Sequence, residues 1–159
     1  MITYTNQSPL DRPCQGVYSI YRSNDFHPMT SVLRYTESLC EALEVDFRLY
    51  TVKMHRRAAE RMNEDSAYHD KKLQQIAEGT YDYGYKFDIE TGKKYHKVVM
   101  SAHGNRSVHC FVDKMTGDVL KSASWKAPAK GVRYNLLDDK SRENCYRNCD
   151  WSGGYLYLR

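Results

Sequence analysis

The sequence predicts an α+β protein in which N-terminal helices pack on an antiparallel sheet of about four to five strands, with a short helix near the C-terminus. Three observations predict this class. Apolar residues recur at helical spacing up to Gly79, an alternation of aromatic residues starts at Tyr81, and the pattern D-x-x-T-G occurs twice between strand-like segments. A length of 159 residues favours a single domain, with a mainly helical part at 1–79 and a sheet part at 80–159.

The helical part is expected to contain three helices, preceded by one strand at Gly16–Tyr21. Thr30 or Ser31 can cap the first helix. A second helix is expected over about 46–62 and a third over 66–78. The third helix should end at Gly79, because glycine readily adopts the left-handed conformation that closes a helix.

The sheet part is expected to be a meander of two hairpins. Asp88 and Asp113 open the two D-x-x-T-G segments, and Gly92 and Gly117 close them. An aspartate that opens a turn and a glycine with a left-handed conformation suit a type I turn followed by a bulge. The expected strands, in chain order, are 81–88, 93–102, 106–113 and 118–123.

The C-terminal segment is expected to form a short helix at 138–149 and a last strand at 155–158. Cys145 and Cys149 lie four residues apart in that helix, and a metal site there would need two more ligands. Five cysteines without a secretory signal at the start of the chain favour free thiols in a reducing compartment. We therefore expect no metal and no cofactor.

Two classes of protein are not expected. The chain contains no run of 18 apolar residues, so neither a transmembrane helix nor a membrane partner is predicted. It also lacks the G-x-S-x-G, H-E-x-x-H, phosphate-loop and C-x-x-C patterns, so an enzyme is not predicted.

The positive charge lies in the second half of the chain. Residues 1–80 carry 10 basic and 11 acidic groups, a balance of −1, whereas residues 81–159 carry 14 basic and 9 acidic groups, a balance of +5. The sum is the net charge of +4. This asymmetry indicates an anionic partner that docks on the C-terminal half.

Residues 119–137 combine this charge with an aromatic side chain. Four basic residues and no acidic residue surround Trp125 in a segment that we interpret as a cationic loop. Such a loop can contact phosphates and stack a base. The alternative is that Trp125 fills the space between the sheet and the helices. The candidate nucleic-acid-binding residues are Lys121, Trp125, Lys126, Lys130 and Arg133, extended by Lys94, Lys97, Arg56 and Arg57.

Two other segments leave alternatives open. The basic cluster that contains Arg56 and Arg57 is either a phosphate-contacting patch or a solvated helix face. The alternating residues Tyr81, Tyr83 and Tyr85, with Phe87, form either a stacking platform on an open sheet or the core face of that sheet.

The segment from Lys94 to Leu136 resembles small uncharacterised proteins of tailed bacteriophages. The shared pattern is F-V-D-x-x-T-G-D-V-x-K, here from Phe111 to Lys121, followed by A-S-W-K-A-P-A-K from Ala123 to Lys130 and an arginine-containing stretch. The architecture is also similar to the nucleus-associated RNA-binding proteins of jumbo phages, which have a whirly-like core. The whirly signature K-G-K-A-A-L has no counterpart here, so this second resemblance assigns no binding residue.

These resemblances imply a phage-encoded, non-enzymatic protein that binds single-stranded RNA, such as messenger RNA, or single-stranded DNA. They also imply that it acts in the cytoplasm of a bacterial host, in association with a phage replication compartment. The alternative function is a host-takeover or phage-shell factor that binds a phage or host protein through the helical part. Self-association into a homo-oligomer is a further option.

Overall fold

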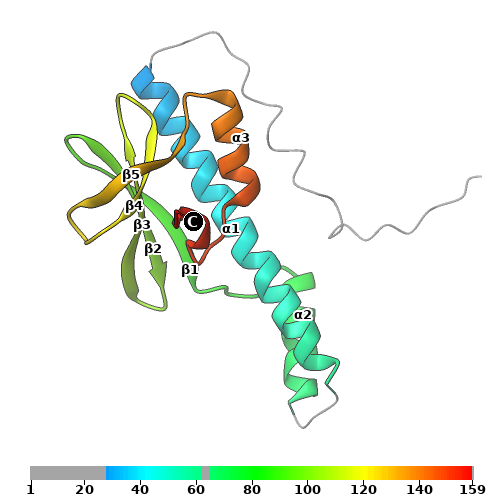
Figure 1. The fold of residues 1–159 in the computed structure, drawn as a ribbon. Helices are drawn as coiled ribbons and strands as arrows, with labels where there is room; N and C mark the ends of the chain where they lie inside the picture. The colour runs from blue at the N-terminus through cyan, green and yellow to red at the C-terminus, as the bar shows by residue number, and fades with distance from the viewer. Residues whose placement is uncertain (1–27, 62–64, 159) are drawn as a thin grey trace, which may run out of the picture.

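The structure is a computed structural model and describes residues 28–61 and 65–158 (Figure 1). The strand expected at Gly16–Tyr21 lies outside the described residues. The helices are α1 (Pro28–Ala59), α2 (Ser66–Ala77), α3 (Asp139–Asn148) and the 3-10 helix η1 (Gly154–Leu156). The strands are β1 (Tyr85–Thr91), β2 (Tyr95–Ala102), β3 (Asn105–Asp113), β4 (Asp118–Ser122) and β5 (Pro128–Asn135). The predicted α+β class is therefore confirmed.

Helix α1 is one continuous element, so the prediction of two helices that meet near Asp46 is wrong. No glycine or proline interrupts the chain between Met29 and Glu78. Buried side chains recur at every fourth position of the helix: Leu39, Leu43, Phe47, Thr51 and His55. Four residues exceed one helical turn by about 40°, so this stripe winds around the helix. Its first part packs on the sheet and its last part packs on α2.

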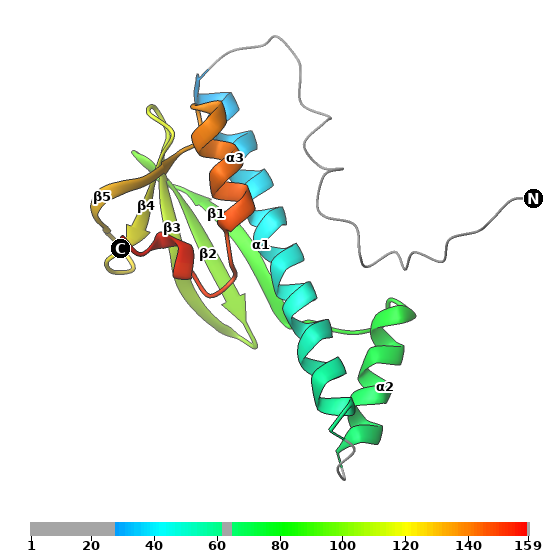
Figure 2. The ribbon, with the colours of Figure 1, turned by 45° about the vertical axis from the view of Figure 1, so that its right-hand side comes forward.

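The second half of α1 and all of α2 form a helical arm that extends beyond the sheet (Figures 1 and 2). Helix α2 buries no residue fully. A hydrogen bond of 2.8 Å between Nδ1 of His55 and Nδ1 of His69 holds α2 to α1. Helix α2 ends before Gly79, which has the predicted positive φ. Within the described residues, no helix combines the length and the apolar character needed to cross a bilayer.

The sheet is an antiparallel meander in the order β1-β2-β3-β4-β5. The four predicted strands are present, although β1 starts at Tyr85 and leaves Tyr81 and Tyr83 before the strand. The fifth strand was not predicted, because residues 128–135 were interpreted as part of a cationic loop. Residues 155–158 do not form the expected last strand, since η1 occupies this position.

The two D-x-x-T-G segments adopt different conformations. In the second segment, Oδ1 of Asp113 accepts the backbone N–H groups of Met115 and Thr116 at 2.9 and 3.1 Å, and Gly117 has a φ of 75°. This is the predicted turn. In the first segment, Asp88 is a strand residue paired with Val99, and the chain turns only after Thr91.

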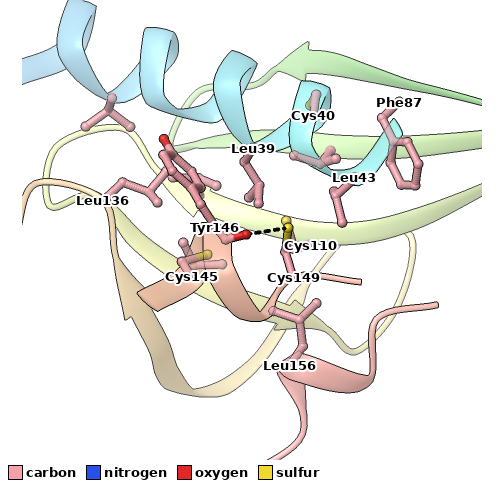
Figure 3. Close-up of a cluster of buried hydrophobic side chains, with 14 residues drawn as sticks. Leu39, Cys40, Leu43, Phe87, Cys110, Leu136, Cys145, Tyr146, Cys149 and Leu156 are labelled. Carbon is pink, nitrogen blue, oxygen red and sulfur yellow. Dashed lines mark hydrogen bonds between the residues drawn. The ribbon is translucent and has the colours of Figure 1, made fainter. Parts of the chain in front are cut away.

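The main core lies between the sheet and the helices α1 and α3, which cover one face that we call the helix-side face (Figure 3). Four cysteines belong to this core: Cys40, Cys110, Cys145 and Cys149. Burial raises the pKa of the Cys40 thiol to about 12, so the group stays protonated and packs as a small apolar side chain. Among the described residues, no group of three or more potential metal ligands comes together.

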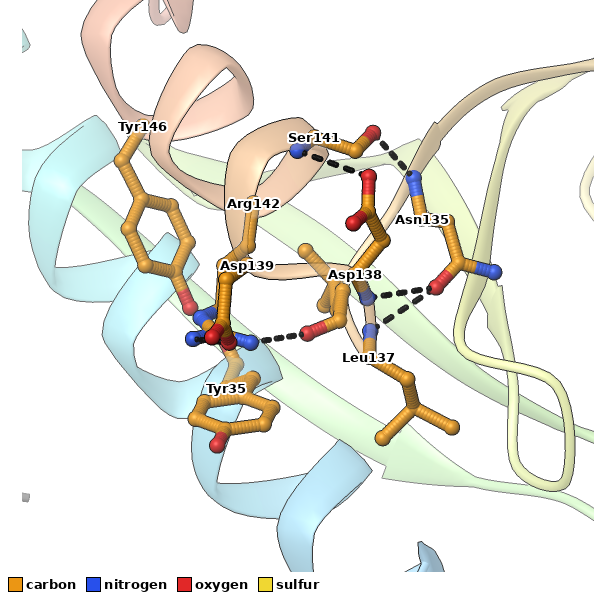
Figure 4. Close-up of polar contacts among 9 residues, drawn as sticks. Tyr35, Asn135, Leu137, Asp138, Asp139, Ser141, Arg142 and Tyr146 are labelled. Atoms are coloured by element: carbon orange, nitrogen blue, oxygen red, sulfur yellow. Dashed lines mark hydrogen bonds and ion pairs between the residues drawn. The ribbon is translucent and has the colours of Figure 1, made fainter. Parts of the chain in front are cut away.

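Helix α3 is joined to the end of β5 and to α1 by polar contacts (Figure 4). The carboxylate of Asp138 caps the helix by accepting the N–H of Ser141 at 3.1 Å. The guanidinium of Arg142 lies 4.0 Å from the centre of the Tyr35 ring, and the hydroxyl of Tyr146 donates to the carbonyl of Tyr35 at 2.7 Å. These contacts fix α3 against the first turns of α1, so the helix-side face is closed at this end.

Candidate functional site

The sheet face that points away from α1 and α3 carries most of the candidate residues, and we call it the open face. Residues paired across neighbouring strands share a face, and adjacent residues in a strand point to opposite faces. Val98 belongs to the helix-side core, so its neighbours Lys97 and Val99 point to the open face. The pairings Glu90 with Lys97 and Ser101 with Arg106 place these residues on the same face.

Trp125 reaches this face from the turn between β4 and β5. The hydroxyl of Ser124 accepts the N–H groups of Lys126 and Ala127 at 3.3 and 3.2 Å, which orders the turn. The indole of Trp125 is 41% exposed and does not belong to the helix-side core. The alternative in which Trp125 fills the space between sheet and helices is therefore wrong.

Two cations lie under the indole. The Nζ atom of Lys97 is 4.7 Å from the ring centre, and the Cζ atom of Arg106 is 5.5 Å from it. Both cations are paired with Glu90, Lys97 at 3.1 Å and Arg106 through the other carboxylate oxygen. One carboxylate therefore holds both cations near the indole, and Trp125 keeps 41% of its surface exposed to solvent.

We call Glu90, Lys97, Arg106 and Trp125 the Trp125 cluster. Hydrogen bonds from Arg106 and then from Lys97 hold the pKa of Glu90 below its ordinary value, so the carboxylate is ionised. The cluster carries two positive charges and one negative charge. An exposed aromatic face next to surplus positive charge can stack a planar base and attract its phosphate.

The structure brings together three of the residues that the sequence selected. Lys97 and Trp125 are in contact, and Lys126 is exposed beside Trp125. Arg106 and Glu90 were missed. The signal that could have found them is the register of the first three strands, which places Glu90 opposite Lys97 and Arg106 opposite Ser101.

Two of the predicted residues lie elsewhere. Lys121 pairs with a core residue and points to the helix side, where its Nζ atom is 4.6 Å from the centre of the Tyr157 ring. Arg133 donates to the backbone carbonyls of Leu156 at 2.8 Å and of Lys130 at 2.7 Å. Arg133 therefore joins β5 to η1, whereas the side chain of Lys130 is exposed on the edge strand.

The remaining predicted residues are far from the Trp125 cluster. Lys94 lies in the turn between β1 and β2, at the opposite end of the sheet from the turn that carries Trp125, and its Nζ atom is 3.8 Å from a carboxylate oxygen of Asp113. Arg56 and Arg57 are exposed in the last turn of α1, on the helical arm (Figure 1). Positive side chains at this position complement the negative end of the helix dipole.

A cleft of about 640 Å³ opens between α1 and the start of β1, and we call it the aromatic cleft. The rings of Phe47 and Tyr85 stack inside it with their centres 3.8 Å apart, and the ring of Tyr83 meets Phe47 edge-on at 6.5 Å. Phe87 is 5% exposed in the helix-side core. The tyrosine series therefore does not form a platform on the open face. Its rings lie on the side of β1 that faces the helices.

Comparison with known proteins identifies the family of the chain. Residues 18–158 match the model of a family described as a family of unknown function, DUF7717, so the chain belongs to that family. No curated protein and no solved structure matches the chain.

Proposed function

We propose that this member of a family of unknown function is a non-enzymatic nucleic-acid-binding protein that holds single-stranded RNA or DNA on the open face of its sheet. The observation that carries this proposal is the solvent-facing indole of Trp125 above Lys97 and Arg106. A base stacked on an exposed aromatic side chain contributes about 1–3 kcal/mol of binding free energy.

A single strand fits this geometry better than a duplex. Trp125 stands at the tip of the turn Ala123–Ala127, so its free face can meet a base only if that base is not stacked on its neighbours in a duplex. Exposed aromatic side chains on a positively charged surface are the usual means of binding single strands without sequence preference.

Four cations near Trp125 are available to the phosphates of a bound strand: Lys97, Arg106, Lys126 and Lys130. Lys126 and Lys130 are exposed and are not in an ion pair with any described residue, whereas Lys97 and Arg106 are held by Glu90. A bound phosphate would replace the carboxylate of Glu90 as the ion-pair partner of Lys97 and Arg106. Binding should therefore weaken as salt concentration rises, because each neutralised phosphate releases counterions.

The resemblance of residues 94–136 to tailed-phage proteins supports a phage-encoded protein. On this proposal it acts in the cytoplasm of the bacterial host, and phage messenger RNA is the natural single strand for it to bind.

The test is a binding titration with single- and double-stranded RNA and DNA at about 50 and 200 mM salt. We expect the natural protein to bind single strands more tightly than duplexes. Trp125→Ala should lower affinity at least about fivefold, and Lys126→Glu with Lys130→Glu should lower both the affinity and its salt dependence.

Matched controls lie away from the open face. Tyr68→Ala removes an aromatic ring that is 56% exposed on the helical arm. Lys140→Glu with Arg147→Glu makes the same change of charge on exposed positions of α3. Equal losses in the control variants and the open-face variants would contradict the assignment of the site.

A second candidate function, a host-takeover or phage-shell factor that binds a protein, is favoured by a different observation. The helical arm and the adjoining part of α1 expose large apolar side chains: Leu49 (46%), Tyr50 (49%), Met54 (38%) and Tyr68 (56%). Exposed apolar groups of this size are typical of protein-binding surfaces. A pull-down with and without nuclease distinguishes the candidates, since a protein partner that survives nuclease and is lost on Tyr50→Ala with Met54→Ala would favour this second function.

A further inference from the structure

The aromatic cleft is separate from the Trp125 cluster, and its walls are built from rings. Phe47 and Tyr85 stack in the wall of the cleft, and Tyr83 also lines it. The guanidinium of Arg48, another lining residue, lies 5.6 Å from the centre of the Tyr83 ring. Aromatic walls with a cation beside them suit a planar base that carries a phosphate.

A close backbone contact shapes the opposite wall. Among the described residues, His103 is the only non-glycine residue with a positive φ, at 48°. Its N–H donates to the carbonyl of Gly84 at 3.1 Å. A Cβ atom added to Gly84 would lie 2.4 Å from Cε1 of the His103 ring. A left-handed conformation is unfavourable for a residue with a Cβ atom, and such conformations concentrate at functional sites. This one holds the imidazole against the cleft, edge-on to Tyr85 at 6.0 Å.

The acidic groups at the cleft already have partners. Glu44 accepts the backbone N–H of Phe87 at 3.1 Å through one oxygen and lies 3.6 Å from Arg48 with the other. Asp82 accepts the N–H of Gly84 at 2.8 Å. Both carboxylates are thus engaged within the protein, and the two cations Arg48 and Lys86 also line the cleft and balance their charge.

The aromatic rings of the cleft lie on the helix side, and the cleft adjoins the open face through two of its lining residues, Lys86 and Ser101. Ser101 lines the cleft and pairs with Arg106, which lies under the Trp125 indole. Ser101 also pairs with Lys86, another residue of the cleft. From Lys97 to Ser101 the strand advances about 13 Å at 3.3 Å per residue. That distance ends at the open-face margin of the cleft and corresponds to about four stacked nucleotides at 3.4 Å each, so it is a minimum for a strand that reaches the cleft.

We propose that the aromatic cleft is a second base-binding subsite, which takes a base of the same single strand whose neighbouring segment stacks on Trp125. This inference rests on the proposed function and adds to it a minimum length of ligand. A strand that reaches only Trp125 uses one subsite. A strand of more than about four nucleotides reaches both and binds more tightly.

The test compares oligouridylates of about three and about ten nucleotides on the full chain and on His103→Gly. This substitution removes the imidazole from the cleft wall while glycine accepts the left-handed backbone, so the fold should be preserved. We expect an unchanged affinity for the short strand and a loss of about fivefold or more for the long strand. Asn105→Gly is the matched control, because it changes an exposed residue of the same turn region that does not line the cleft.

Tyr83→Leu provides a second variant, and NMR of the aromatic side chains provides a second measurement. The short strand should shift the Trp125 signals alone, and the long strand should also shift those of Tyr83 and His103. If both variants bind the long strand as the natural protein does, the cleft assignment is wrong while the proposed function stands.

A wrong proposed function would give a different binding result from a wrong cleft assignment. If the natural protein binds no strand of either length, the proposed function is wrong, and the inference about the cleft fails with it. If an aromatic peptide shifts the Tyr83 and His103 signals and the long strand does not, the cleft is a peptide site and the inference is overturned.

Discussion

The two faces of the five-stranded sheet differ in burial and charge, and the difference is visible in adjacent residues. Val98 is fully buried under the helices, whereas its neighbour Lys97 points to the open face and lies under the Trp125 ring. The helix-side face contains the main core, and the open face contains the cations and the exposed indole. A single step along β2 therefore separates a residue that stabilises the fold from a residue that we expect to bind.

The open face is not purely polar. Val99 and Phe111 are 0% and 3% exposed, although neither belongs to the helix-side core. The ring of Tyr95 meets Phe111 edge-on at 5.7 Å. The open face therefore also contains buried apolar side chains, so substitutions near them should have small effects on stability rather than none.

The largest effect is expected on the helix side. Leu43→Ala removes a fully buried side chain of α1 and should lower the free energy of unfolding by about 2–5 kcal/mol, because it leaves a cavity in the core. Chemical denaturation measures this loss. Leu49→Ala, on an exposed position of the same helix, is the control and should change it by less than about 0.5 kcal/mol. A similar loss for both variants would contradict the placement of Leu43 in the helix-side core.

Acid should lower the stability of the protein through its buried histidines. Burial lowers the pKa of His109 to about 4, and burial also lowers the pKa values of His55 and His96. A histidine whose folded pKa is depressed favours the unfolded state as it takes up a proton. His109 should therefore cost about 3 kcal/mol of stability as pH falls from about 6.5 to about 4. Denaturation at several pH values tests this, and His109→Gln should flatten the curve in that window.

On the open face, Lys97→Met should separate binding from stability. The methionine keeps much of the apolar stem but loses the positive charge. We expect the free energy of unfolding to change by less than about 1 kcal/mol, and the slope of log affinity against log salt to fall by about one. A loss of stability comparable to that of Leu43→Ala would show that Lys97 belongs to the fold rather than to the binding surface.

The smallest effect is expected at Glu90, and its direction is the informative part. Glu90→Gln releases Lys97 and Arg106 from their ion pairs, so a phosphate no longer competes with a carboxylate for them. Affinity for a single strand should rise about two- to fivefold. Asp88→Gln changes the charge of another open-face residue of β1, one that pairs with Lys86, and should raise affinity less. A fall in affinity for Glu90→Gln would mean that the carboxylate holds the cations in the binding geometry.

The candidate site was only partly predictable. Lys97 and Trp125 were selected from charge and residue type, and the structure brings them together. Arg106 and Glu90 were not selected, since their positions depend on the register of strands that the sequence does not specify by itself. Arg133 was selected for its charge, but its guanidinium is bonded to backbone carbonyls, which no pattern of residues reveals.

The fold was likewise only partly predictable from the sequence. Asp113 and Gly117 form the predicted turn, because the side-chain oxygen and the left-handed glycine act within five residues. The same pattern at Asp88 forms no such turn, since β1 continues through it in pairing with β2. Strand β5 was missed because Pro128 and Gly131 are typical of loops and its pairing with β4 is irregular.

The sequence alone predicts the class of the fold, the end of α2 before Gly79, the second hairpin turn and the excess of positive charge in residues 81–159. Helical periodicity and turn chemistry act over a few residues, so they can be recognised without the rest of the chain. The position of Trp125 on the open face, next to Lys97 and Arg106, is visible only in the folded structure. That position depends on which face of the sheet the helices cover and on the register of the strands, which are set by contacts between residues far apart in the chain.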